Sequence, residues 1–182
     1  MRAPVQVAKK VAPKNPGPTN KKQKAQDRVR WRNVWMTARM RDQFIAAEKI
    51  LLKKFPNAPK LSFSKGSWMP YSRLSGPTHN GAGVADLRDS PYNTAQRKYL
   101  DKAMKDVGLY PYYREAGWDG SADNSHWHVL DQVTTGMNAS AKRQVASYKA
   151  GRNGLNNNAP DRSYRPKTPV IWKYLLGRAV PV

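Results

Sequence analysis

Three histidines and one aspartate are the residues of this chain whose types and spacing could perform chemistry. The histidines are His79, His126 and His128, and Asp86 follows His79 by seven residues. His126 and His128 lie two apart on a predicted strand, so both imidazoles point to the same face of a sheet. Two imidazoles and a carboxylate form the open ligand set of a catalytic zinc site, which leaves a fourth position for water. The pattern predicts a metal site, and histidines that are simply packed in a core or lie on the surface remain the alternative.

The elements that must position these side chains follow from hydrophobic periodicity. The pattern predicts a small, mostly antiparallel sheet with flanking helices, which is an α+β fold. The expected helices cover about 27–55, 94–107 and 139–150, and the expected strands cover 61–64, 83–87, 109–114 and 127–133. The start of the first helix, 28–35, is basic and aromatic and is expected to be helical, either continuous with the rest or separate. Gly81 and Gly83 let the backbone fold back between His79 and Asp86.

Composition excludes several classes of protein. The 182 residues include no cysteine, which rules out a disulfide scaffold, a thiolate zinc finger, an iron–sulfur cluster and a cysteine nucleophile. Apolar runs are interrupted by charge after a few residues, whereas a membrane span needs roughly 20, so no membrane partner is expected. The basic start lacks an uninterrupted apolar stretch, so we predict no signal peptide in this chain.

The net charge of +21 is concentrated towards the ends. Residues 1–60 carry a net charge of +13, residues 61–140 are neutral, and residues 141–182 carry +8. This distribution predicts a basic, Pro- and Lys-rich arm over 1–38, a domain over 39–155 and a basic, Pro-rich arm over 156–182. The arms are expected to be disordered or ordered by a partner, which could be nucleic acid, an anionic wall polymer or another protein. A solvated tether is the remaining alternative. No motif for sequence-specific nucleic-acid recognition supports nucleic acid as the partner.

The motifs resemble those of a known group of enzymes. Thr78-His79 with Asp86, followed by His126-Trp127-His128, resembles the zinc metallopeptidases that include lysostaphin, D-alanyl-D-alanine carboxypeptidase and the hedgehog signalling domain. The resemblance is closest to small D-Ala-D-Ala carboxypeptidase-like proteins of actinobacteria and their phages. It covers roughly 39–155 and includes the stretches at 66–68 and 150–155.

The resemblance implies a role for each of these residues. It makes His79, Asp86 and His128 the ligands of Zn²⁺ and His126 the catalytic histidine that does not bind the metal. The related carboxypeptidases have a glutamate three residues before the last ligand, where this chain has Ser125. The resemblance also implies a basic substrate-binding residue near the first strand of the sheet.

Further candidates complete this implied site. Lys65 is the candidate for the substrate-binding residue. Asp119 or Asp123 could orient a histidine from behind, although a solvated loop position is the simpler interpretation of either.

The implied function is hydrolysis of peptidoglycan peptides by a zinc peptidase. The implied protein is phage-encoded, associated with the virion or the host cell wall, and able to contact other virion proteins. Two other functions stay open. One is a structural virion or assembly protein on a peptidase fold that no longer catalyses, and the other is a nucleic-acid-binding protein.

Overall fold

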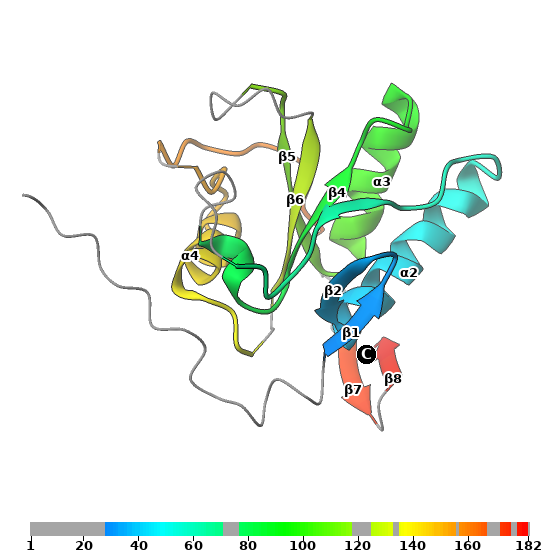
Figure 1. Ribbon diagram of the computed structural model, residues 1–182. Coiled ribbons are helices and arrows are strands. Elements are labelled where there is room, and N and C mark those ends of the chain that lie inside the picture. The colour runs from blue at the N-terminus through cyan, green and yellow to red at the C-terminus, as the bar shows by residue number, and fades with distance from the viewer. Residues whose placement is uncertain are drawn as a thin grey trace, which may run out of the picture.

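A computed structural model shows how the elements pack around one sheet (Figure 1). It describes residues 28–70, 77–117, 125–132, 135–155 and 157–166, together with two strands at 172–175 and 178–181. Most of the predicted N-terminal arm, 1–27, lies outside the described residues. Within the described part of the chain, no helix combines the length and apolar character needed to cross a bilayer.

The central sheet consists of four antiparallel strands in the order β3-β4-β6-β5. Their bounds are β3 Phe63–Lys65, β4 Val84–Arg88, β5 Leu109–Arg114 and β6 His126–Asp131. Neighbouring side chains alternate between the two faces, as the period of a strand requires. Leu87 and Trp127 therefore point to one face, and Asp86 and His128 point to the other.

Helices cover both faces of this sheet (Figure 1). Helices α2, Ala38–Lys54, and α3, Thr94–Asp106, pack on the face that carries Leu87 and Trp127. Helix α4, Ala139–Lys149, packs on the other face against a smaller cluster that includes Val84, Tyr110 and Leu130. The α+β fold with a mostly antiparallel sheet that the sequence predicts is confirmed.

The strands and helices around the predicted site match the expected ranges closely. Strands β4, β5 and β6 and helices α3 and α4 begin and end within two residues of the predictions. Asparagine side chains fix both helix starts, because Asn93 accepts from the Gln96 amide and Asn138 accepts from the Ala141 amide. Strands β7 Trp172–Leu175 and β8 Arg178–Pro181 form an antiparallel pair, and their side chains are not among those the structure describes.

The helix predicted over 28–35 is wrong. Strands β1, Arg28–Trp31, and β2, Val34–Thr37, form an antiparallel hairpin, and α2 begins only after Thr37, whose hydroxyl caps the Met40 amide. The turn residues Arg32 and Asn33 have positive φ angles of 49° and 69°, which fits a two-residue hairpin turn. Local propensity failed here because side chains of the hairpin pack against the core formed by α2, α3 and the sheet.

A bidentate ion pair fastens this hairpin to the domain. The Arg32 guanidinium donates to the two carboxylate oxygens of Glu48 at 2.6 and 2.8 Å and to the Leu61 carbonyl at 2.6 Å. Glu48 also accepts from the Leu61 amide at 2.7 Å. Three segments that are distant in sequence are therefore joined at one carboxylate.

We predict that Glu48→Ala lowers the free energy of unfolding by about 2 kcal/mol, because Arg32 and the Leu61 amide lose their partner in a half-buried place. Urea unfolding followed by circular dichroism measures the change. Arg41→Ala is the control, since it breaks the more exposed pair with Asp42 and should cost less than about 0.5 kcal/mol. Equal losses in the two variants would contradict the assignment of Glu48 as the fastening point.

Candidate metal centre

Strand register places Asp86 directly opposite His128. The two residues are partners across β4 and β6, and their side chains share the face that α4 covers. Directly opposed side chains in an antiparallel pair lie close enough to interact. The distance from His128 Nδ1 to Asp86 Oδ1 is 2.8 Å, and both side chains are buried.

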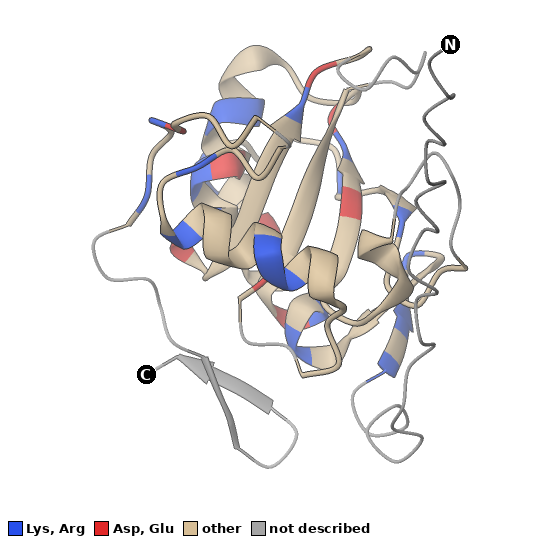
Figure 2. Cartoon of the chain, turned by 90° about the vertical axis from the view of Figure 1, so that its left-hand side faces the viewer, with Lys and Arg blue, Asp and Glu red and all other residues tan. Residues whose placement is uncertain are grey.

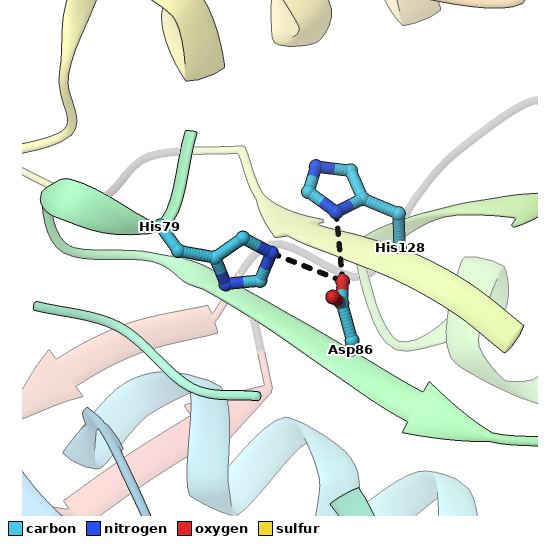
Figure 3. Close-up of side chains that lie close together, drawn as sticks. All are labelled: His79, Asp86 and His128. Carbon is cyan, nitrogen blue, oxygen red and sulfur yellow. Dashed lines mark hydrogen bonds and ion pairs between the residues drawn. The ribbon is translucent and has the colours of Figure 1, made fainter. Parts of the chain in front are cut away.

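His79 reaches the same carboxylate from a short 3₁₀ turn, η1, Thr78–Asn80. Its Nε2 lies 3.1 Å from Asp86 Oδ1, and its side chain is 2% exposed (Figure 3). The rings of His79 and His128 are nearly perpendicular, with centroids 5.1 Å apart. The structure therefore brings together the three residues proposed as ligands, although they span fifty positions of the sequence.

Tight backbone packing holds the turn that carries His79. A Cβ added at Gly81 would lie 2.7 Å from the Asn138 amide nitrogen and 2.9 Å from the Gly136 carbonyl oxygen, so only glycine fits. The Asn138 side-chain amide donates to the carbonyls of Pro77 and Thr78, which ties the turn to the start of α4. Gly83 has a positive φ of 76°, as expected of a glycine that lets the backbone fold back, whereas Gly81 is extended and is required by the close approach alone.

The hydrogen-bond partners of the imidazoles indicate where their lone pairs point. His79 Nδ1 lies 2.8 Å from the Gly66 carbonyl, which can only accept, so Nδ1 carries the proton and Nε2 of the neutral ring offers a lone pair to Asp86. His128 Nε2 lies 3.0 Å from Gln144 Oε1. When Nε2 donates to that oxygen, Nδ1 of the neutral His128 ring also presents a lone pair to the carboxylate.

The lone pairs of the two imidazoles and of the Asp86 carboxylate point towards one another, an arrangement that suits a bound cation. The three ligand atoms all lie within 4.8 Å of one another, and the two imidazole nitrogens lie 3.1 and 2.8 Å from the same carboxylate oxygen. Ligands of a tetrahedral zinc ion with bonds of about 2.0–2.1 Å are separated by roughly 3.3 Å, so small adjustments would admit the ion. The buried group of His79, Asp86 and His128 could therefore hold a metal ion.

The pKa values of these groups favour their metal-binding forms. Burial raises the pKa of Asp86, but the hydrogen bonds and charges of His128 and His79 outweigh it and hold that pKa well below its ordinary value. Burial lowers the pKa of His128 and favours its neutral ring, even though Asp86 acts in the opposite direction. A metal ion needs an ionised carboxylate and neutral imidazoles, and the shifts of Asp86 and His128 favour these forms of the two groups.

His126 stands beside the cluster and outside the ligand group. Its Nε2 lies 4.0 Å from Asp86 Oδ2, and its side chain is 19% exposed. A polar cavity of about 200 Å³ opens next to it. This cavity is lined by Ser64, Lys65, Asp86, Arg88, Ser90, Ser125 and His126. The structure thus places Lys65 and His126 at one opening, adjacent to the carboxylate of the cluster.

Asp89 is a positioning residue that sequence reasoning missed. It is 1% exposed, and its Oδ2 accepts hydrogen bonds from Tyr113 at 2.6 Å, Ser125 at 2.8 Å and Arg97 at 3.1 Å. The Ser125 contact fixes the backbone immediately before His126. The position of Asp89 directly after the strand that carries Asp86 could have suggested this role. Its hydrogen-bond partners come from three other parts of the chain, however, and the sequence does not show which segments meet there.

Four further residues concern the orientation of the histidines. Gly66 and Gln144, which orient the two imidazoles, were also missed, because neither residue type marks such a role in sequence. Asp119 and Asp123 lie outside the described residues.

A scan against protein-family models, a search of curated proteins and a search of solved structures each find no match for this chain.

We predict that the purified chain binds one equivalent of Zn²⁺ and that His128→Ala weakens this binding by more than about 100-fold, because the variant lacks one of three ligands. Gln144→Ala should weaken zinc affinity by roughly 10- to 100-fold, since it frees the ring that Gln144 orients. Competition with a chromophoric chelator measures both affinities. His126→Ala is the control and should retain wild-type affinity; a loss as large as that of His128→Ala would show that the ligand set is misassigned.

We predict that Asp89→Asn lowers stability at pH 7 and that this difference shrinks as pH falls. Burial raises the pKa of Asp89, but the hydrogen bonds from Tyr113, Ser125 and Arg97 lower it overall. Because the pKa of an unfolded aspartate is about 3.9, the ionised form stabilises the fold above that pH and loses its advantage as pH falls through the depressed value. Urea unfolding between pH 3 and 7 tests this, and a difference that does not change with pH would contradict it.

Proposed function

We propose that this chain is a zinc-dependent peptidase that hydrolyses peptides of bacterial peptidoglycan. The observation that carries the proposal is the convergence of His79 Nε2, Asp86 Oδ1 and His128 Nδ1 in a buried cluster that adjoins a polar cavity. The resemblance to lysostaphin- and carboxypeptidase-type zinc peptidases supports the same conclusion. It also supports a phage origin, with the protein in the virion or at the host cell wall.

The donor set favours zinc among the common divalent ions. Two imidazoles with one carboxylate suit zinc, whereas magnesium and calcium sites consist of oxygen ligands. Zinc held by three protein ligands keeps an open position, and there it polarises a carbonyl and lowers the pKa of water towards neutrality. His79, Asp86 and His128 would hold such an ion, and His126 is not part of this ligand group.

His126 is the residue placed to move a proton. It lies at the edge of the cluster, partly exposed and facing the cavity, so its imidazole can reach both solvent and a bound peptide. An imidazole has an ordinary pKa near neutrality and can accept a proton from water and then donate one to the leaving amine. Ser125 cannot act in place of the glutamate, because a neutral hydroxyl is a far weaker base than a carboxylate.

The cavity beside His126 favours a substrate with a carboxylate. Lys65 and Arg88 line it, and within the described residues neither has an acidic partner. The hydroxyls of Ser64 and Ser90 add hydrogen-bond donors to the same walls. Stem peptides of peptidoglycan carry free carboxylates, so they match this cavity in charge and in hydrogen-bonding groups.

One observation favours a second candidate, an assembly protein on a fold that no longer catalyses. The related carboxypeptidases have a glutamate at the position of Ser125. In this chain the Ser125 hydroxyl donates a hydrogen bond to the buried carboxylate of Asp89. In this case the basic arms would hold the protein among virion components or on nucleic acid. Figure 2 shows Lys and Arg residues on several elements of the described domain.

Digestion of purified muropeptides by the zinc-loaded full chain tests the proposal. We predict new amine and carboxyl termini by mass spectrometry, and we predict that His126→Ala lowers kcat by about 100-fold or more while zinc binding remains intact. Lys65→Ala should raise KM, and the exposed Lys60→Ala is its matched control. Zinc binding without turnover of any muropeptide would reject the peptidase and favour the assembly protein.

A further inference from the structure

A second cavity, of about 630 Å³, lies at the outer edge of β5 and apart from the metal cluster. Its walls come from α3, β5 and the segment 161–164, and none of the three histidines lines it. Cavities that bind small molecules typically measure roughly 300–1,000 Å³, so this one has the size of a ligand site.

Two exposed tyrosines provide flat walls for this cavity. Tyr113 is 40% exposed and Tyr164 is 44% exposed, and both rings line it. Their hydroxyls are anchored, since Tyr113 donates to Asp89 at 2.6 Å and Tyr164 donates to Asp106 at 2.8 Å. Two rings held by their hydroxyls offer apolar surface to a ligand at low cost in conformational entropy.

Four basic residues, Arg97, Lys98, Lys105 and Arg114, line the cavity, and two of them form ion pairs. Arg97 binds Asp89 at 3.1 Å, and Lys105 binds Asp101 at 2.6 Å. Asp161 adds a further carboxylate to the wall. The ion pairs and the carboxylates of Asp101 and Asp161 weaken the attraction of these cations for a phosphate backbone, and all of these groups supply hydrogen bonds for a polar ligand.

We infer that this cavity binds a sugar ring of the peptidoglycan glycan strand, a β-1,4-linked polymer of N-acetylated amino sugars. The C–H face of a pyranose packs on the negative face of an aromatic ring, which Tyr113 and Tyr164 present. Its hydroxyl and acetamide groups can form hydrogen bonds with Thr94 and Ser163 on the same walls. The inference rests on the proposed function, because the glycan strand is the polymer to which the substrate peptides are attached.

Calorimetric titration of the full chain with chitotetraose, a tetramer of β-1,4-linked N-acetylglucosamine, tests the site. Saturable binding is expected, and Tyr164→Ala and Tyr113→Ala should each weaken it by about tenfold or more. Tyr113→Phe should weaken binding less than Tyr113→Ala, because it keeps the ring and loses only the hydroxyl that anchors it. Trp35→Ala is the matched control, since Trp35 is 41% exposed but does not line the cavity, and it should leave the affinity unchanged.

Three results would overturn the inference: no binding of the tetramer, an equal loss in Trp35→Ala, or tighter binding of an oligothymidylate to the same tyrosines with a steep salt dependence. Zinc content measured on the same samples separates this site from the peptidase proposal. Glycan binding by a chain that holds no zinc would reject the peptidase and leave the sugar site standing. Zinc binding and muropeptide turnover without tetramer binding would reject only the sugar site.

Discussion

A buried carboxylate between two imidazoles is the constraint on which the rest of this structure depends. Asp86 is 3% exposed, and its ionised oxygen lies within 3.1 Å of nitrogens from both His79 and His128. When both rings are neutral and donate through their other nitrogens, three electron pairs meet and repel one another. A proton or a metal ion must then lie among them, so occupancy of the cluster is coupled to the stability of the fold.

Contacts between segments that lie far apart in the sequence hold the side chains of His79, Asp86 and His128 in position. The pairing of β4 with β6 sets Asp86 opposite His128, and the close approach at Gly81 fixes the turn of His79. Behind the sheet, Asp89 collects hydrogen bonds from β5, α3 and the residue before His126. Consequently the cluster is held by the sheet and by the start of α4, while His126 lies beside it and lines the polar cavity.

The clustered histidines and aspartate could be predicted from the sequence more readily than the residues that hold them in position. Histidine is rare in this chain, and the spacing of His126 and His128 placed both on one face of a strand, which β6 confirms. Spacing alone could not select between them, because strand register decides which imidazole meets Asp86. Gly66, Asp89 and Gln144 act through contacts between distant segments, and no local pattern reports such contacts. The hairpin at 28–37 was missed for a similar reason, since core packing and two positive φ angles override a helical pattern.

X-ray absorption spectroscopy of the zinc-loaded chain tests the central claim most directly. The account predicts four nitrogen or oxygen neighbours at about 2.0–2.1 Å and the multiple-scattering signature of two imidazole rings, which His128→Ala reduces to one. A six-coordinate oxygen environment, or a signature of two imidazoles that survives His128→Ala, would contradict it.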